Sequence, residues 1–405
     1  MTKNENTPMD TSASMNEKFS ADTDRVGGAS AKRSLLALDT AELVAWLAAR
    51  KLPKFRAAQI LGWVERELVT SFDVMTNLPK SLRSALDAEF SLRSTRVVRV
   101  QGTAGEPGRR EGGTGTRKLL LELGDGEQIE CVLLCDDREH RTACISSQVG
   151  CAMGCAFCAT GLDGVVRNLT ADEIFEQLLR IAELLPRGGF GNNDDSGNGG
   201  GSGNGGESAS ERLSNIVVMG MGEPLQNVDA VMAALQRASD PEGLNIGARR
   251  ITISTVGIPA AIRQLAEMDC RFNLAISLHA PNDAMRSALI PANRSTGIAA
   301  ILDAAWYFFD RTGRRVTFEY VLLDDVNDAP DHAEQLAVLL QGSRSLVNLI
   351  PYNPVAGLTF RTPGSTRVKR FAEILESHGV ETSIRYRKGE KIDAACGQLR
   401  RRVDM

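Results

Sequence analysis

The sequence contains no run of eighteen or more apolar residues, the length a membrane-spanning helix needs. Its first twenty residues are polar and mixed in charge, without the basic and then apolar order of a secretion signal. The eight cysteines lack the even, short spacing of a disulfide framework. The net charge of -4 is too small to point to a nucleic-acid partner or to exclude one. We therefore expect no membrane span, no secretion signal, and a reducing cytoplasmic compartment.

Length and composition indicate an ordinary globular chain with several parts. With 405 residues, 42% hydrophobic and 24% charged, the chain can bury a large core and has room for two or three domains. Residues 1–32 carry few large apolar groups and predict a disordered tail. In residues 33–95 apolar side chains recur at three- and four-residue spacing, which predicts a small helical module. Residues 96–141 alternate in short runs between Gly-rich turns and predict a β extension of antiparallel strands.

Residues 142–385 alternate between short apolar runs and amphipathic helical patterns. Six such units predict an α/β fold, a parallel and partly closed (βα)6 barrel with its chemistry at the C-terminal ends of the strands. Thr170 and Glu173 have the spacing of a capping box at the start of the first barrel helix. Residues 188–210 interrupt the pattern with a Gly-rich stretch, which predicts a flexible surface insertion without a catalytic role.

Three cysteines follow the first predicted barrel strand in the order Cys151-Ala-Met-Gly-Cys155-Ala-Phe-Cys158. Three thiolates on one loop can ligate a [4Fe-4S] cluster and leave one iron open to a small molecule. Zinc would normally take four ligands, and no second cysteine pair with a ligand-like spacing follows. The pattern therefore favours the cluster over zinc or inert thiols.

With Phe157 before the third cysteine, the triplet and the barrel resemble the radical S-adenosylmethionine (SAM) superfamily. The resemblance implies that the open iron binds the amino and carboxyl groups of SAM and that an electron from the cluster cleaves it. Polar groups at the predicted strand ends suit that ligand, although each one alone would more often be a turn or a cap. The SAM contacts we expect are Gly222, Glu223, Ser254, Ser277, Leu278, His279 and Asn353.

Five motifs make the resemblance closer. They are CysIleSerSerGlnValGlyCys (144–151), GlyMetGlyGluPro (220–224), SerLeuHisAlaProAsn (277–282), AsnLeuIleProTyrAsnPro (348–354) and AspAlaAlaCysGlyGlnLeu (393–399). In this order they resemble the RlmN and Cfr family of radical-SAM RNA methyltransferases, from about Leu35 to Arg400 without the Gly-rich insertion.

The resemblance implies a reaction with two molecules of SAM per turnover and three roles for residues of this chain. Cys396, in the C-terminal segment 386–405, is methylated first, and a radical derived from that S-methyl group adds to an adenine carbon. Glu130 is the proton acceptor, and Cys144 releases the product by forming a transient disulfide with Cys396. Taken singly, either cysteine would more often be a buried structural thiol. Neighbouring acids compete with Glu130 for its role: Asp136, Asp137 and Glu139.

Cys131, Cys135 and Cys270 have no place in that reaction, and we interpret them as structural. From Arg361 to the C-terminus the chain carries eleven Lys and Arg against six Asp and Glu, which suits a phosphate backbone or a solvated basic face. Basic residues that could contact phosphate are Arg249, Arg250, Arg314, Arg315, Arg385, Arg387, Lys388 and Lys391.

The resemblance also implies the substrate and partners. RlmN-type enzymes methylate C2 of an adenine in the peptidyl-transferase centre of 23S rRNA and of the adenine 3′ of the anticodon in tRNA, whereas Cfr-type enzymes methylate C8. Residues 55–60 and 76–80 resemble the RlmN branch, so we expect C2 methylation and an RNA-binding role for residues 33–95. An external one-electron reductant of the flavodoxin or ferredoxin type and a monomeric enzyme are also expected.

Two other functions are compatible with parts of the sequence. One is a noncatalytic RNA-binding protein that a metal stabilises. The other is a different radical-SAM reaction, such as activation of a glycyl radical, which would leave Cys144 and Cys396 without a role.

Overall fold

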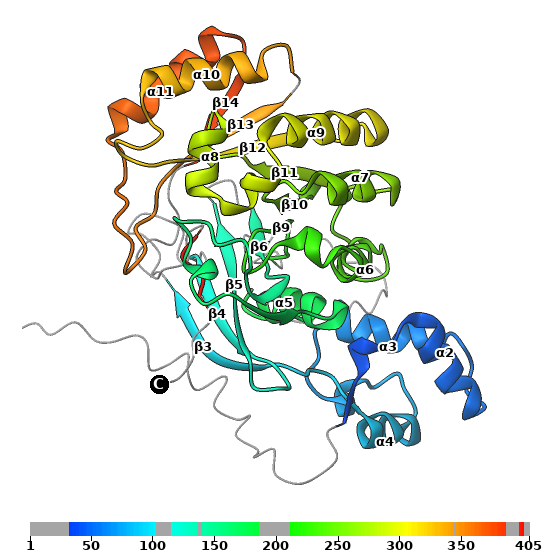
Figure 1. Cartoon of the computed structure of the whole chain (residues 1–405). Coiled ribbons are helices and arrows are strands. Elements are labelled where there is room, and N and C mark those ends of the chain that lie inside the picture. The colour runs from blue at the N-terminus through cyan, green and yellow to red at the C-terminus, as the bar shows by residue number, and fades with distance from the viewer. Residues whose placement is uncertain are drawn as a thin grey trace, which may run out of the picture.

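A computed structural model describes residues 32–102, 115–136, 140–185, 211–343, 345–385 and 397–400. The largest element of these residues is a ten-stranded sheet, and helices cover its outer side (Figure 1). The disordered tail predicted for residues 1–32 and the insertion predicted for residues 188–210 lie outside the described residues, apart from Lys32. No helix in the described ranges is long and apolar enough to cross a membrane.

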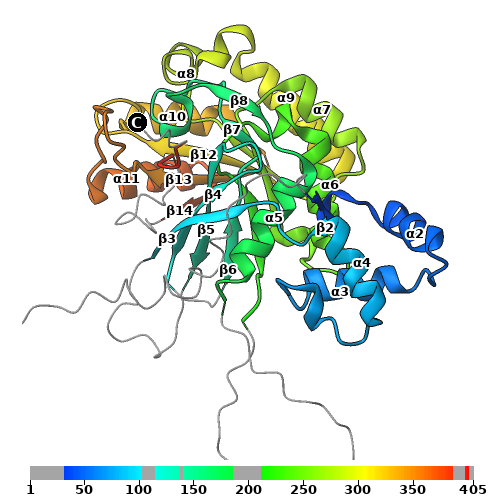
Figure 2. The same ribbon diagram turned by 90° about the horizontal axis from the view of Figure 1, so that it is seen from below.

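The barrel predicted from the alternating pattern is confirmed. Six parallel strands form the barrel, and at least one helix lies between each of them and the next parallel strand; after the first, a short hairpin precedes the helix. The strands are β6 (Arg141–Cys144), β9 (Asn215–Val218), β10 (Ile251–Thr255), β11 (Asn273–Ser277), β12 (Val316–Leu322) and β13 (Leu346–Pro351). The helices are α5 (Ala171–Ala182), α6 (Val228–Ser239), α7 (Pro259–Glu267), α8 (Asp283–Leu289), α9 (Ile298–Thr312), α10 (Pro330–Leu340) and α11 (Ser365–Ser377). Figure 2 shows the helices arranged around the outside of the curved sheet.

Two elements were not expected from the sequence. A seventh parallel strand, β14 (Glu381–Ile384), pairs with β13 at the edge of the sheet. A short antiparallel hairpin of β7 (Gln148–Gly150) and β8 (Val165–Asn168) encloses the cysteine loop. This hairpin fixes both ends of the loop that carries the cysteine triplet.

The β extension consists of three antiparallel strands, β3 (Arg96–Gly102), β4 (Arg117–Glu122) and β5 (Gln128–Cys135). β5 also pairs antiparallel with β6, the first barrel strand. The extension therefore continues the barrel sheet, and its inner face adjoins the mouth of the barrel.

The N-terminal residues form a helical module with α2 (Thr40–Ala49), α3 (Arg56–Glu65) and α4 (Lys80–Glu89). The short strands β1 (Arg33–Ser34) and β2 (Phe90–Ser91) pair next to the helices. Arg237 of α6 fastens the module to the barrel, because its guanidinium donates to Glu65 Oε1 at 2.8 Å and to Leu36 O at 2.7 Å. The module and the barrel thus share a partly buried polar contact.

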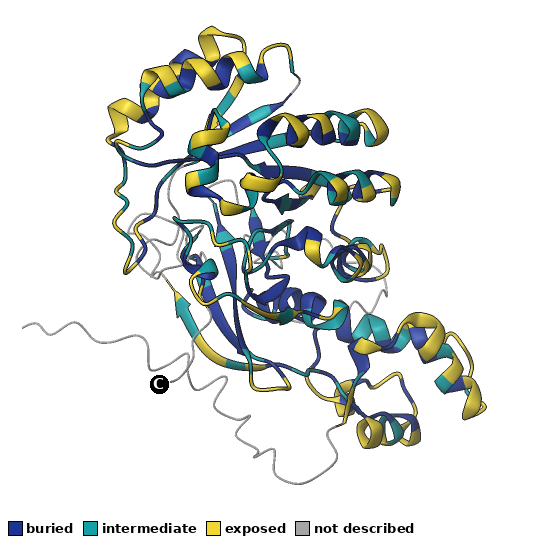
Figure 3. Ribbon diagram, viewed as in Figure 1, coloured by how far each residue is buried: buried dark blue, intermediate teal, exposed yellow. Residues whose placement is uncertain are grey.

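Local sequence explains how α5 begins. Thr170 and Glu173 form the predicted capping box, in which the Thr170 N–H donates to Glu173 Oε2 at 2.9 Å. Burial then follows the helical period, since the faces of the barrel helices that meet the sheet are buried and the outer faces are exposed (Figure 3). α5 is buried almost all round, because the extension and the N-terminal module cover its outer side.

Candidate active site

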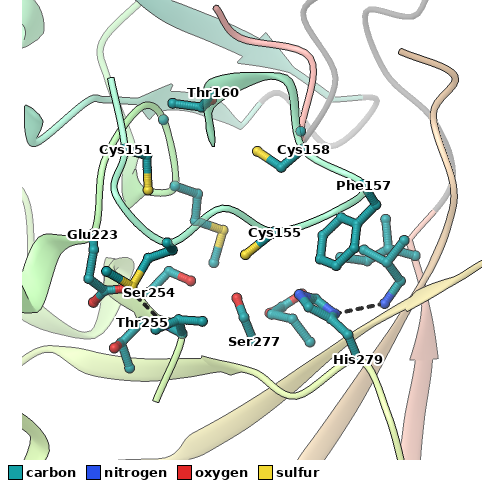
Figure 4. A pocket seen from close by; sticks show the side chains of 18 of the residues that line it. Cys151, Cys155, Phe157, Cys158, Thr160, Glu223, Ser254, Thr255, Ser277 and His279 are labelled. Atoms are coloured by element: carbon teal, nitrogen blue, oxygen red, sulfur yellow. Dashed lines mark hydrogen bonds between the residues drawn. The ribbon is translucent and has the colours of Figure 1, made fainter. Parts of the chain in front are cut away.

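The cysteine triplet lies at the mouth of the barrel, where its three side chains line one cavity together with residues from the strand ends. Figure 4 shows the sulfur atoms of Cys151, Cys155 and Cys158 turned toward the same space, with Ser254 and Ser277 on the opposite side of it. The structure therefore brings together the cysteine loop and the strand ends, as the barrel prediction requires.

Glycines determine the path of the cysteine loop. Gly150 has φ +78°, and a Cβ atom there would lie 2.0 Å from the Gly164 carbonyl oxygen, so no other residue fits. The Cys151 N–H donates to the same oxygen at 2.8 Å. The loop consequently closes tightly at its base, which fixes the position of its first cysteine.

An apolar contact holds the middle of the loop. Phe157 is buried, and its ring lies edge-on to the His279 ring with centroids 4.9 Å apart. Val256, Val321 and Ile350 belong to the same buried cluster. The aromatic residue before the third cysteine therefore anchors the loop against three barrel strands.

The three thiols fit the donor set of the predicted cluster, which takes three cysteine ligands. Burial raises the pKa of Cys151 to about 11 and also raises the pKa of Cys155, so iron would have to displace protons from both. Among the described residues, no three Cys, His, Asp or Glu side chains converge closely enough to hold a single metal ion. The cluster assignment rests on the residue pattern and the shared cavity.

The segment after β9 approaches the cysteine hairpin closely. A Cβ atom on Gly220 would lie 2.6 Å from Ser146 Oγ, and one on Gly222 would lie 2.6 Å from Gln148 Cβ. Gly222 also has φ +100°. Both positions require glycine, so this segment can pass beside the hairpin and line the cavity.

Glu223 is fully buried behind that segment. Its Oε1 accepts the Leu225 N–H at 3.1 Å and its Oε2 accepts the Val256 N–H at 2.8 Å. Burial raises the pKa of Glu223, and these hydrogen bonds oppose the rise. The carboxylate therefore ties the end of β10 to the segment after β9, a structural role that the sequence did not indicate.

The structure gathers most of the expected SAM contacts. Six of them line the cavity: Gly222, Glu223, Ser254, Ser277, His279 and Asn353. Leu278 does not; its side chain is in the core, while its N–H donates to Glu319 O at 3.0 Å. Any contact of Leu278 with a ligand would therefore come from its backbone.

His279 is held in one tautomer. Its Nδ1 accepts the Val321 N–H at 3.0 Å, which leaves Nε2 to carry the proton. Burial, assisted by the nearby Arg286 charge, lowers the pKa of His279 to about 3. The imidazole is thus neutral near pH 7 and offers a single N–H donor.

Arg286, on α8, is a buried cation that no sequence motif indicated. Its guanidinium donates to Ser277 O at 3.0 Å, to Leu278 O at 3.1 Å and also to Val256 O. It therefore joins the ends of β10 and β11 beneath the cavity. A lone arginine on a short helix gave no sequence signal for this role.

Glu130 and Cys144 lie on the same face of the extension. Cys144 pairs in register with Val132, two residues after Glu130 on β5, so the three side chains share one face. Both predicted residues are buried. Of the rivals, Asp136 is at the far end of β5 with His140 Nδ1 at 2.9 Å, and Asp137 and Glu139 lie outside the described residues.

The C-terminal residues Gly397–Arg400 lie across this site. Gly397 lines the cavity, and its carbonyl oxygen accepts the Ala159 N–H at 2.8 Å. Leu399 O accepts the Thr160 hydroxyl at 2.6 Å, and the Arg400 N–H donates to Glu130 Oε2 at 3.0 Å. Cys396 itself lies outside the described residues, but the residue that follows it reaches the cysteine loop.

The three cysteines without a predicted role are buried away from the triplet. Cys131, Cys135 and Cys270 are all within the core, and burial raises the pKa of Cys270 to about 11 and that of Cys131 above its usual range. Buried thiols of raised pKa are poorly reactive. Their environment agrees with the structural interpretation.

Residues 33–92 match the family model described as the ribosomal RNA large subunit methyltransferase N-terminal domain. The "Probable dual-specificity RNA methyltransferase RlmN" of Rhodopirellula baltica is 48% identical over 370 residues, 91% of each chain. The protein of the same name from Symbiobacterium thermophilum is 46% identical over 352 residues, 87% of this chain and 86% of its own.

The chain belongs to the RlmN family. A crystal structure of a radical SAM methyltransferase from Sphaerobacter thermophilus is also similar, with a TM-score of 0.78 and 42% identity over 91% of this chain and 99% of that one. Family membership and the radical-SAM fold are thus confirmed. The match over residues 33–92 covers the helical module, which therefore corresponds to the family's N-terminal domain.

Proposed function

We propose that this RNA methyltransferase methylates C2 of an adenine in 23S rRNA and of the adenine 3′ of the anticodon in tRNA, through an S-methylcysteine at Cys396. Relatives over most of the chain carry the name dual-specificity RNA methyltransferase. The observation that carries the proposal is the position of Gly397–Arg400, which lie between the cysteine loop and Glu130. A methyl carrier at residue 396 would be attached directly to this segment.

The cofactors proposed are a [4Fe-4S] cluster on Cys151, Cys155 and Cys158 and two molecules of SAM per turnover. When bound, they supply one methyl group and one 5′-deoxyadenosyl radical. The three thiols, the glycine segment at 220–222 and the inner serines surround the space where these groups would lie. The apolar wall around Phe157 would limit the access of water to the radical chemistry.

In the first stage the Cys396 thiolate would attack the methyl carbon of one SAM, so that a new S–CH3 bond forms as the sulfonium S–CH3 bond breaks and S-adenosylhomocysteine leaves. In the second stage one hydrogen atom of that methyl group would pass to the 5′-deoxyadenosyl radical, which becomes 5′-deoxyadenosine, and a methylene radical would remain on Cys396. It adds to C2 of the adenine and forms a carbon–carbon bond between the RNA and the enzyme.

Glu130 and Cys144 then complete the exchange. The adduct returns one electron to the external one-electron carrier, and Glu130 accepts the C2 proton, so that the ring becomes aromatic again. Cys144 thiolate attacks the Cys396 sulfur, the S–C bond breaks with its electrons on carbon, and a proton completes the methyl group. A disulfide remains, and a reductant must supply two electrons before the next turnover.

Substrate RNA would be recognised by its shape, with the target adenine unstacked toward the barrel mouth. The helical module at 33–95 and exposed arginines such as Arg249 and Arg250 are available for backbone contacts. We propose a monomeric enzyme acting in the cytoplasm with a flavodoxin- or ferredoxin-type reductant.

The test is anaerobic incubation of the enzyme with SAM, a reductant and 23S rRNA or tRNA, followed by mass spectrometry of the adenosines. We expect 2-methyladenosine from both RNAs. 8-Methyladenosine would instead identify the Cfr type of reaction, and a product from the Cys396→Ala variant would overturn the role of Cys396.

A further inference from the structure

Glu319 is a buried carboxylate inside the barrel to which neither the cysteine motif nor the predicted strand-end contacts assign a role. It lies on β12, is 4% exposed, and lines the same cavity as the cysteine triplet. Asn348 Nδ2 donates to its Oε1 at 3.0 Å, whereas its buried Oε2 has no hydrogen-bond partner within the described part of the chain. A buried oxygen without a partner costs free energy, so it indicates a ligand that meets it.

The backbone places Glu319 next to the expected SAM contacts. Its register partner on β11 is Ser277, and register partners in a parallel sheet point to the same face. Figure 4 shows the Ser277 side chain directed toward the cysteine loop. The Leu278 and His279 N–H groups both donate to Glu319 O, at 3.0 and 3.3 Å. Its carboxylate is therefore on the inner face of the barrel, level with Ser277.

A cation near Glu319 offsets part of the cost of burying its carboxylate. Burial raises the pKa of Glu319, and the positive charge of Arg385 opposes that rise. Arg385 follows β14 and lines the same cavity, where its Nη1 lies 3.8 Å from Met219 Sδ. Asn348 already donates to Oε1, and a hydrogen-bond donor on a ligand would satisfy Oε2 in the same way.

We infer that Glu319 binds the ribose hydroxyls of SAM. This inference rests on the proposed function, which requires SAM in the cavity. SAM offers three kinds of donor: the ammonium group, the adenine amino group and two adjacent ribose hydroxyls. The family resemblance already assigns the ammonium to the open iron, and backbone carbonyls can meet the adenine amino group. Adjacent hydroxyls match the paired oxygens of a carboxylate, as in dinucleotide-binding folds, where an acidic residue binds the ribose.

A double-mutant cycle tests this inference, with one change in the protein, at Glu319, and one in the ligand, at a ribose hydroxyl. The cluster-loaded enzyme and its Glu319→Gln variant are each titrated with S-adenosylhomocysteine, which cannot transfer a methyl group, and with its 2′-deoxy and 3′-deoxy analogues. We expect Glu319→Gln to weaken binding of S-adenosylhomocysteine about 10- to 100-fold. The native enzyme should bind at least one deoxy analogue about as weakly as the variant binds S-adenosylhomocysteine. For that analogue, Glu319→Gln should cause no further loss of affinity.

The ribose assignment would be overturned if, for both deoxy analogues, the loss of affinity from Glu319→Gln multiplies the loss from the missing hydroxyl. It would also be overturned if the Glu319→Gln effect disappears only with an N6-dimethyl analogue, which lacks the adenine N–H donors. Glu65→Gln provides a matched control, because Glu65 is also a buried carboxylate but lies in the helical module. Its affinity for S-adenosylhomocysteine should equal that of the native enzyme.

Thermal unfolding without ligand separates a binding role from a structural one. Glu319→Gln should unfold at the same temperature as the native enzyme or at a higher one, because a buried amide costs less than a buried carboxylate with an unpartnered oxygen. A lower midpoint with unchanged affinity would overturn the inference. If the losses of affinity from Glu319→Gln and from removal of a ribose hydroxyl are additive, and the native enzyme makes 2-methyladenosine, only the role of Glu319 is refuted. If the losses are not additive and the native enzyme makes no 2-methyladenosine, only the proposed function is refuted.

Discussion

Lys118 Nζ lies 3.0 Å from Glu130 Oε1, and both side chains are 2% exposed. The two residues are diagonal neighbours on adjacent strands, because the register partner of Lys118 is Val132. The other carboxylate oxygen accepts the Arg400 N–H. The proposed proton acceptor is therefore oriented by the extension on one side and by the C-terminal segment on the other.

Removal of Lys118 should be strongly destabilising. Lys118→Met leaves the Glu130 charge buried without its cation, and we expect the free energy of unfolding to fall by about 3 kcal/mol. Urea unfolding measures the change. Arg96→Met is the control, because Arg96 and Glu122 form an exposed pair in the same extension, which should be worth less than about 1 kcal/mol. Equal effects of the two substitutions would contradict the account.

The Cys144→Ala variant should trap a covalent adduct between RNA and protein. The thiol that breaks the bond to Cys396 is gone, so the RNA remains attached after the carbon–carbon bond forms. A denaturing gel should show the retarded species, and the Cys144→Ala, Cys396→Ala double variant should not form it. Cys131→Ala, at a buried cysteine on the same extension, is the control and should release RNA normally. Free methylated RNA in native amounts from Cys144→Ala would refute its role.

Arg286 should be needed for stability. Arg286→Leu leaves the carbonyls of Ser277, Leu278 and Val256 without their buried donor, so the free energy of unfolding should fall by about 3 kcal/mol. Arg294→Leu removes an exposed arginine from the segment just after α8 and should change it by less than about 0.5 kcal/mol. An Arg286→Leu protein as stable as the native one would show that these carbonyls do not depend on the guanidinium.

His279 should remain neutral across the physiological pH range. Its pKa in the folded state is about 3, against about 6.5 in an unfolded chain. Between these values only the unfolded state binds the proton, so this histidine's contribution to stability is complete above pH 6.5 and is lost as the pH falls toward 3. Histidine-selective NMR can follow the ring, since the chain has only four histidines and His279→Gln identifies the signal. A midpoint near pH 6.5 would contradict the buried tautomer.

Local patterns in the sequence were sufficient for much of the fold and for part of the site. The cysteine spacing, the capping box at Thr170 and the strand-end motifs are each contained within a few residues. The seventh strand was missed because Glu381–Ile384 is a short edge strand with exposed and half-buried residues and no apolar run.

The buried polar contacts could not be predicted in the same way. Lys118, Arg286 and Glu319 act through partners on other strands, and each is an ordinary charged residue in its local sequence. Their roles depend on strand register and on burial, which only the assembled sheet determines. The packing of Gly397–Arg400 against the cysteine loop is likewise a contact between the two ends of the barrel sequence.

The fate of the methyl hydrogens tests the central claim, that Cys396 carries the methyl group before the RNA receives it. The enzyme is given SAM with a trideuterated methyl group, a reductant and 23S rRNA, and the methyladenosine is analysed by mass spectrometry. We expect two deuterium atoms in the new methyl group and one in the 5′-deoxyadenosine released, because one is abstracted and a proton replaces it. A product that retains all three deuterium atoms would contradict the account.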